Sequence, residues 1–294
     1  MDQAEQLRNV IKLKPMPKPL ARVLTVTSGK GGVGKSNTSI NLACQFKRMG
    51  YKVVILDADF GMANIEIMFG TVPKHNLSDL IYKGKNITQI ITWGPMEIGF
   101  ISGGSGIAGL SNLNGDNLNY IIKNLAELDS IADIIIIDTG AGISDAVLDF
   151  LVASGEILVV ATPEPTSITD SYSLLKVLNR HPRFSREESQ IKVIANKVSR
   201  EIEGEVMFNK LDTVVNRYLN LPETYLGAIP YDHHLEAAVM QQMPVSLTSP
   251  NAKSALAYER LAYTLMDKEY NKVTVKRGMA AFFSHIVAGN KKMG

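Results

Sequence analysis

The sequence is poor in cysteine, in net charge and in long apolar runs. Cys44 is the single cysteine, which excludes an internal disulfide framework and favours a reducing cytosol. A net charge of +2 over 294 residues is too small to indicate nucleic-acid binding by itself. No apolar run approaches the roughly 20 residues that span a bilayer, and the polar start MDQAEQLRNV is unlike a secretory signal. We therefore expect a globular protein of the cytoplasm.

Apolar, β-branched segments alternate with helical patterns from residue 22 onward. The expected strands are 22–28, 51–59, 133–140, 156–163 and 191–197. The expected helices are 36–49, 116–129, 144–154, 166–180, 201–219, 233–241 and 250–270. This order predicts a single α/β domain, a mostly parallel twisted sheet with helices on both faces. Ligands of such sheets bind beyond the carboxyl ends of the strands, where the chain places Gly29, Asp57, Asp138, Glu164 and Asn196.

Proline and charge patterns divide the chain into four expected segments. A short helix over 1–13 precedes a proline-rich linker over 14–21, because the prolines of KPMPKP interrupt helices. The nucleotide-binding domain is expected over 22–270. A separate amphipathic helix is expected over 271–294.

The stretch GKGGVGKS, Gly29 to Ser36, matches the phosphate-binding pattern G-x-x-x-x-G-K-[ST]. Its setting between an expected strand and an expected helix disfavours a plain glycine-rich turn, since backbone N–H groups there can surround phosphate oxygens. Lys35 would bind the β- and γ-phosphates, and the Ser36 hydroxyl would hold Mg²⁺. The predicted nucleotide-binding residues of this loop are Gly29, Lys30, Gly31, Gly32, Val33, Gly34, Lys35, Ser36 and Asn37.

A phosphate-binding loop of an enzyme also needs acids near the metal and a group that orients the attacking water. Asp57 and Asp59 end one expected strand in DADFG, and Asp138 ends another in DTGAG. Their position at strand ends suits this chemistry. Capping of helices or turns is the structural alternative for each.

Four stretches, KGGVGKS, LDADFGMANIEIMFG, IIIDTGAG and TPEPTSITDSY, resemble the MinD/ParA family of deviant Walker A ATPases. The resemblance runs from residue 22 to about residue 265. It implies ATP and Mg²⁺ as cofactors and slow hydrolysis in an ATP-dependent homodimer. The extra lysine of the loop, Lys30, would reach across the dimer to the partner's nucleotide, and would be catalytic together with Lys35 and Asp59.

The same resemblance implies further roles. Asp59 would position the hydrolytic water, while Asp57 and Asp138 would support Mg²⁺ with Ser36. Asn196 would read the adenine. Other residues are implied at the base pocket, at the nucleotide or at the dimer partner, namely Pro230, Asp232 and Glu164. Thr139 and Gly140 of DTGAG depart from the residues that many relatives carry before Ala-Gly.

The C-terminal segment combines an apolar helical stripe with basic neighbours such as Lys276 and Arg277. This pattern is typical of helices that lie in a membrane interface, and a helix docked on the domain is the alternative. MinD-like proteins carry such a tail, so the resemblance favours reversible binding to the anionic inner face of the cell membrane. The residues predicted to contact it are Met279, Phe282, Phe283, Ile286 and Val287.

The N-terminal DQAEQLR resembles, within the same family, an element of regulators of flagellar number and placement. There the element stimulates FlhF, a partner GTPase of the signal-recognition-particle type. The implied contacts are Gln3, Leu7 and Arg8. Flagellar switch or basal-body proteins are further partners that this resemblance implies.

Three rival functions belong to the same wider group. An iron protein of the nitrogenase type is excluded because a bridging cluster needs more cysteines than the lone Cys44. A division-site regulator of the MinD type and a DNA-partition ATPase of the ParA type stay as alternatives. Non-specific DNA binding would need a basic surface, so no specific nucleic acid is expected as a partner.

Overall fold

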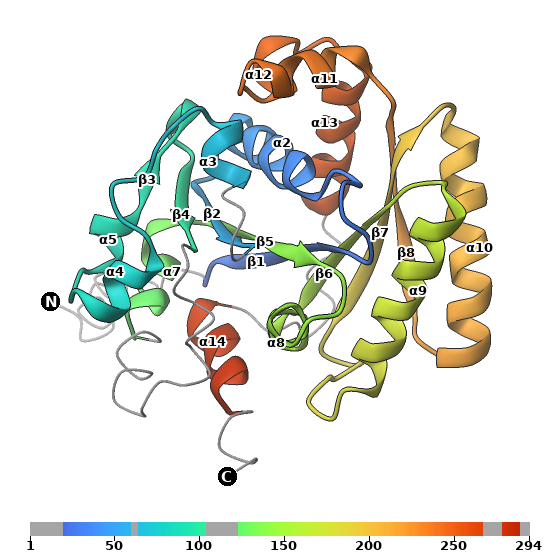
Figure 1. The fold of residues 1–294 in the computed structure, drawn as a ribbon, viewed down its shortest axis with the longest axis horizontal. Coiled ribbons are helices and arrows are strands. Elements are labelled where there is room, and N and C mark those ends of the chain that lie inside the picture. Colours follow the sequence, from blue (N-terminus) through green and yellow to red (C-terminus); the bar gives the residue numbers. More distant parts are fainter. Residues whose placement is uncertain (1–19, 60–63, 104–122, 267–277, 289–294) are drawn as a thin grey trace, which may run out of the picture.

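A computed structural model of the chain describes residues 20–59, 64–103, 123–266 and 278–288. In this part of the chain eight strands form one sheet in the order β3-β4-β2-β5-β1-β6-β7-β8 (Figure 1). Every neighbouring pair is parallel except β3 and β4. The strands are β1 Arg22–Ser28, β2 Val53–Ala58, β3 Thr92–Trp93, β4 Gly99–Ser102, β5 Ile134–Ala141, β6 Glu156–Ala161, β7 Gln190–Val198 and β8 Glu223–Pro230.

Helices cover both faces of this sheet, so the predicted α/β fold is confirmed. They are α2 Lys35–Arg48, α3 Asn64–Met68, α4 Leu77–Tyr82, α5 Ile87–Ile90, α7 Leu128–Ile131, α8 Asp145–Ala153, α9 Pro165–Arg180, α10 Glu201–Leu219, α11 His233–Met240, α12 Val245–Thr248, α13 Lys253–Met266 and α14 Met279–Ala288, with a 3₁₀ turn at Pro95–Glu97.

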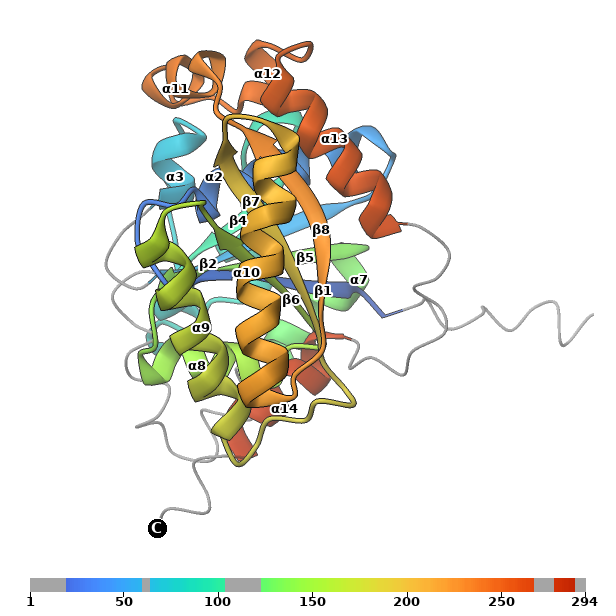
Figure 2. The ribbon, with the colours of Figure 1, turned by 90° about the vertical axis from the view of Figure 1, so that its right-hand side faces the viewer.

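The alternation of side chains along each strand explains the two helical layers. On β5, Ile134 and Ile136 pack into a core formed with α2 and α13. Ile135 and Ile137 point to the other face, where α4, α5, α7, α8 and α14 lie. A third cluster fills the space between β6, β7 and the helices α8, α9 and α10; α10 lies along β7 and β8 in Figure 2.

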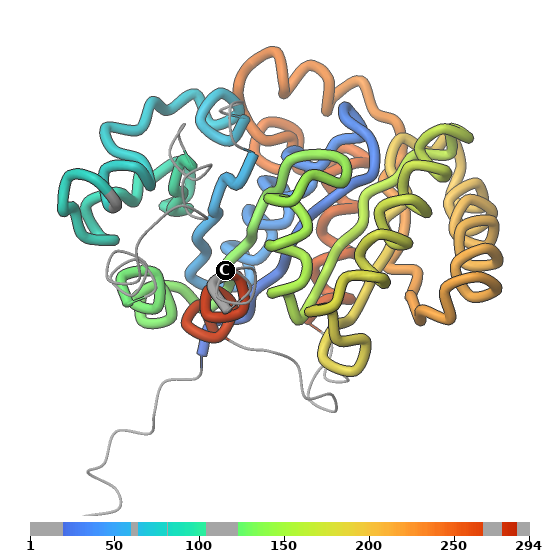
Figure 3. The backbone as a smooth tube through the Cα atoms, turned by 60° about the horizontal axis from the view of Figure 1, so that its bottom comes forward, coloured from blue at the N-terminus to red at the C-terminus, as the bar shows by residue number. Residues whose placement is uncertain are grey.

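The C-terminal helix α14 is docked on the domain, between α7 and α8 (Figure 3). Met279, Phe282, Phe283 and Ile286 are 0–7% exposed and belong to the core of that face. The ring of Phe282 stacks on Phe150 of α8, with centroids 5.9 Å apart. In this structure the protein itself covers these four side chains, and their expected contact with a membrane stays a prediction. The Val287 side chain lies outside the described residues.

Polar contacts hold α14 at both ends. Both carboxylate oxygens of Asp129 accept the backbone N–H of Met279, at 2.9 and 3.1 Å. At the other end, the guanidinium of Arg183 donates to the carbonyls of His285 and Ile286, at 3.0 and 3.3 Å, and pairs with Asp149 of α8. The helix thus shares the core of the preceding domain instead of forming a segment apart. Within the described residues, no helix has both the length and the apolar character needed to cross a bilayer.

Glu223, at the start of β8, is expected to make the free energy of unfolding depend on pH. It is buried, and neither carboxylate oxygen has a hydrogen-bond partner among the described residues. Burial, aided by the charge of Asp212, raises its pKa from 4.5 to about 8. Because the folded pKa is the higher one, the stabilisation is complete below pH 4.5 and is lost as pH rises through 8.

We therefore expect Glu223→Gln to remove a pH dependence from the unfolding free energy. Wild type should lose stability relative to this variant by up to about 1.4 kcal/mol per pH unit between pH 5 and 8. Urea unfolding of both proteins at pH 5, 7 and 9 measures the difference. Parallel pH profiles would show that Glu223 ionises normally in the fold.

Candidate nucleotide site

The loop from Gly29 to Gly34 joins β1 to α2 and has the backbone geometry that phosphate binding needs. Gly32 and Gly34 have φ angles of 76° and 100°, in the left-handed region that favours glycine. A Cβ on Gly29 would lie 2.2 Å from the carbonyl carbon of Asp170 in α9, so only glycine fits there. The loop leads into α2, whose N-terminal N–H groups favour an anion.

A cavity of about 660 Å³ opens over this loop, within the size range of ligand pockets. The predicted segments DADFG and DTGAG reach it, through Asp59 and Gly140 respectively. The lining residues from the loop are Gly31, Gly32, Gly34, Lys35, Ser36 and Asn37. The chain thus brings the ends of β2 and β5 to the same cavity as the loop.

Two carboxylates lie side by side behind the loop, because Asp57 on β2 pairs in register with Asp138 on β5. Asp138 is fully buried; its Oδ1 accepts from the Ser39 hydroxyl at 2.8 Å, and its Oδ2 has no hydrogen-bond partner among the described residues. Burial and the charge of Asp138 raise the pKa of Asp57 to about 7. Such a pair suits a divalent cation, which would relieve this repulsion. The predicted residues therefore fit Mg²⁺, held with the Ser36 hydroxyl.

Asp59 lies at the mouth of the cavity and is held in place by Asn64. The side-chain amide of Asn64 donates to Oδ2 of Asp59 at 3.0 Å. The backbone N–H of Asp59 donates to Oδ1 of Asp57 at 3.1 Å. Oδ1 of Asp59 lies near Gly140, where a Cβ would come within 3.3 Å. Asn64, in GMANIE, was not predicted from the sequence, although its place five residues after Asp59 was a usable signal.

We expect Asp59→Ala to trap an ATP-bound dimer, because the change would remove the group to which the family resemblance assigns the orientation of water and would leave the phosphate loop intact. Size-exclusion chromatography with Mg²⁺ and ATP measures the trapped species. Asn64→Ala is the matched variant and should show the same effect more weakly, since Asp59 then loses only its support. A monomeric Asp59→Ala protein would mean that Asp59 has a structural role.

Lys30 does not point at its own phosphate site in this structure. Its Nζ donates to Glu164 Oε2 at 2.7 Å and to the Thr166 hydroxyl at 2.9 Å, at the start of α9. The Lys30 side chain is 36% exposed and that of Glu164 is 61% exposed. The ammonium of Lys30 lowers the pKa of Glu164. In this structure Lys30 therefore binds an exposed carboxylate, and its predicted contact with nucleotide stays a prediction. The sequence did not reveal the contact of Lys30 with Thr166.

Asn196 and Lys197 bind the phosphate loop from behind. The Asn196 amide donates to the Val33 carbonyl at 2.7 Å, and Lys197 Nζ donates to the Gly32 carbonyl at 2.9 Å. Lys197 adopts a φ of 58°, which is uncommon for a residue other than glycine. Asn196 is therefore placed next to the loop, and its predicted contact with adenine stays a prediction.

The predicted base-pocket residues Pro230 and Asp232 lie at the end of β8. Asp232 is buried and caps α11 by accepting the N–H of His234 at 3.0 Å. Its other oxygen accepts the N–H and the hydroxyl of Ser254, each at 2.9 Å. Despite its burial, these bonds lower its pKa to about 2. The structure thus gives Asp232 the task of fixing the turn after Pro230, and a direct base contact of either residue stays a prediction.

Comparison with known proteins identifies the family of this chain. A sequence profile of the CobQ/CobB/MinD/ParA nucleotide-binding domain matches residues 24–245. The chain belongs to this family. It is 37% identical to the antiactivator FleN of Pseudomonas aeruginosa, over 82% of this chain and 85% of that protein. It is 32% identical to the flagellum site-determining protein YlxH of Helicobacter pylori, over 97% and 98%.

Solved structures share the fold. The septum site-determining protein MinD of Pyrococcus horikoshii, complexed with Mg-ADP, superposes with a TM-score of 0.66 at 24% identity, over 85% of this chain and 98% of that chain. The MinC–MinD complex of Aquifex aeolicus gives a TM-score of 0.65 at 21% identity, over 88% of this chain and 99% of that chain. The family and its phosphate-binding loop together identify an ATP-binding P-loop ATPase domain, as the sequence predicts.

Proposed function

We propose that this ATPase is a switch that controls the number or placement of flagella. The proposal is supported by the similarity to FleN, over 82% of this chain, and to the flagellum site-determining protein YlxH, over 97% of this chain. The observation that carries the switch itself is the position of Lys30, an extra loop lysine turned away from its own phosphate site onto Glu164. A cation held there is free to serve a second subunit.

Each residue of the site would have its own role in ATP hydrolysis. Lys35 and the loop N–H groups would bind the phosphates, and Ser36, Asp57 and Asp138 would hold Mg²⁺, which neutralises phosphate charge when bound. Asp59, supported by Asn64, would orient the attacking water.

Lys30 completes the site only from the opposite subunit of a homodimer. Its pairing with Glu164 is largely exposed to solvent, and exposed ion pairs contribute little to stability. Breaking it on dimer closure therefore costs little. We propose that ATP closes the dimer by drawing Lys30 to the partner's phosphates, and that hydrolysis reopens it.

Binding to an anionic membrane would require α14 to leave its groove. The helix packs on α8, which begins at Asp145, just after the DTGAG switch at the nucleotide. We propose that closure around ATP shifts α8 and releases α14 to the inner face of the cell membrane. Two released helices on one dimer would raise the avidity by ~10²–10⁴ over a single helix.

The N-terminal segment is proposed to stimulate an FlhF-type GTPase through Gln3, Leu7 and Arg8, which lie outside the described residues. We expect deletion of residues 1–19 to leave ATP binding and dimerisation intact and to abolish GTPase stimulation. Assays of both activities on the deletion protein test this. Leu7→Ala with Arg8→Ala is the matched point variant. A deletion protein that still stimulates the GTPase would contradict the proposal that the N-terminal segment is the stimulating element.

A further inference from the structure

Trp93 forms a half-exposed aromatic surface at the edge of the sheet, outside the nucleotide pocket. It lies on β3, the first strand in the sheet order, and is 55% exposed. It pairs in register with Gly99 of β4. A Cβ on Gly99 would approach the indole to 3.3 Å, so the glycine lets the ring lie close over the neighbouring strand.

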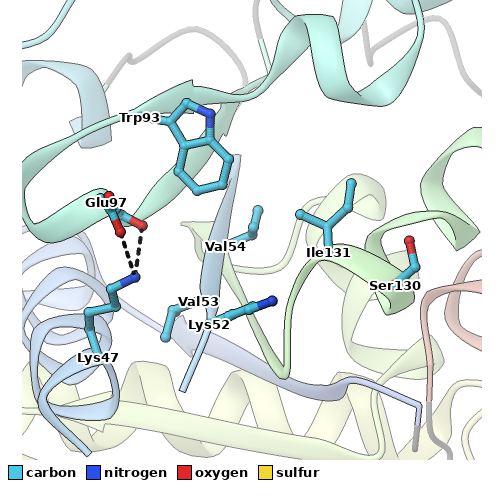
Figure 4. Close-up of a pocket in the computed structure, with 8 residues that line it drawn as sticks. All are labelled: Lys47, Lys52, Val53, Val54, Trp93, Glu97, Ser130 and Ile131. Carbon is cyan, nitrogen blue, oxygen red and sulfur yellow. Dashed lines mark hydrogen bonds and ion pairs between the residues drawn. The ribbon is translucent and has the colours of Figure 1, made fainter. Parts of the chain in front are cut away.

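Two hollows meet at this indole. One, of about 630 Å³, is bounded by Trp93, by the start of β2 at Lys52 and Val54, and by Ile131 of α7 (Figure 4). The other, of about 550 Å³, is bounded by Trp93, Val72 and Gln89. Trp93 is thus a lining residue that the two hollows share.

The rim of both hollows is basic, although the whole chain carries a net charge of only +2. Lys47 and Lys52 line the first hollow, and Lys74 and Lys85 line the second. Glu97 is the one carboxylate that lines either of these hollows among the described residues. Its side chain is 87% exposed and lies 3.5 Å from Lys47, a spacing that leaves the pair weak.

We propose that this surface, the Trp93 surface, binds an extended acidic segment of a partner protein. Successive side chains of an extended chain point to opposite sides, so apolar side chains can enter both hollows while the backbone crosses the indole. Aspartate or glutamate beside them would meet the four lysines, as electrostatic complementarity requires. Tryptophan is a frequent anchor in such interfaces. A flat bilayer would fill neither hollow.

The Trp93 surface is separate from the nucleotide site. The first hollow lies at the amino end of β2, at Val53 and Val54, whereas Asp57 is at the carboxyl end of the same strand. Partner segment and nucleotide can therefore be bound together. This interface goes beyond the proposed roles of the dimer, the membrane helix and the N-terminal segment.

The test is a selection with a phage-displayed library of random 12-residue peptides on the full-length, ADP-loaded protein. Binding of the enriched peptides to Trp93→Ala is then measured. Enriched peptides should combine acidic with apolar residues. Because Trp93 is the sole tryptophan, its fluorescence should shift on binding the corresponding synthetic peptides. Lys52→Glu and Lys74→Glu should each weaken binding by roughly tenfold. Lys210→Glu, on α10 at the other edge of the sheet, should not.

Unchanged ADP binding by all variants verifies that they are folded. The proposal is overturned if no peptide is enriched, if the enriched peptides are neutral or basic, or if they bind Trp93→Ala equally well. A single-stranded 20-nucleotide DNA that displaces the peptides and binds more tightly would also overturn it, since the surface would then serve nucleic acid.

Discussion

Lys30→Ala is expected to lower ATP turnover by ~10³-fold or more, because a cation supplied in trans to transferring phosphate is worth ~10³–10⁵ in rate. ADP binding should be unchanged, since Lys30 is turned away from its own phosphate site and pairs with Glu164. The loss should therefore appear in kcat and in ATP-dependent dimerisation. Steady-state phosphate release and ADP titration measure the two quantities.

Two matched variants sharpen this result. Lys35→Ala should abolish nucleotide binding itself, which separates the two lysines of the loop. Thr166→Val removes only the second acceptor of Lys30, at 2.9 Å, and should retain hydrolysis within a few-fold. If the Lys30→Ala protein hydrolyses ATP within a few-fold of wild type, Lys30 is not a catalytic cation.

The double change Phe282→Ala, Phe283→Ala is expected to have the largest effect on stability. Both rings are 2% exposed and pack in one core with α8, and a buried Phe→Ala change costs about 3–5 kcal/mol. Chemical unfolding of the ADP-bound protein measures the loss. An unchanged unfolding free energy would mean that α14 is not docked in solution, as a purely membrane-facing helix would predict.

A milder variant separates docking from membrane contact. Arg183→Met removes the bonds to the end of α14 and keeps its apolar stripe. We expect this variant to bind anionic liposomes even with ADP, whereas wild type binds them only with ATP. Co-sedimentation with liposomes or with duplex DNA measures both affinities. Binding of wild type to DNA alone would favour a partition ATPase instead.

The sequence could predict the central strands and the site because each carries a strong local signal. Ile134 to Ile137 form a continuous apolar run, and Gly29 to Ser36 match a motif whose geometry depends on glycine. The edge strands gave no such signal. β3 has two residues and β4 has four, and the β8 sequence ETYLGAIP is interrupted by Gly227. Their pairing depends on neighbours distant in sequence, which one sequence does not contain.

The contacts that the sequence did not reveal have a similar cause. The apolar stripe of α14 was visible, but a stripe does not say whether lipid or protein covers it. Phe150 and Arg183, which contact α14 in this structure, lie more than a hundred residues earlier in the chain. The partner of Lys30 could not be foreseen either, because β6 brings Glu164 to the loop only in the folded chain. Asp232 could be recognised from its position in a motif. Its hydrogen bonds to Ser254 could not, because they depend on where α13 lies in the fold.

The central claim, that Lys30 acts in trans, is tested most directly by mixing two inactive proteins before ATP is added. In a heterodimer of Lys30→Ala with Asp59→Ala, one site keeps its own Asp59 and receives Lys30 from the partner. Phosphate release by an equal mixture should rise clearly above the average of the two separate variants. It should approach about a quarter of the wild-type rate if half of the dimers are mixed, because each mixed dimer has one intact site of two. A mixture no faster than the average of the two separate variants would contradict the account.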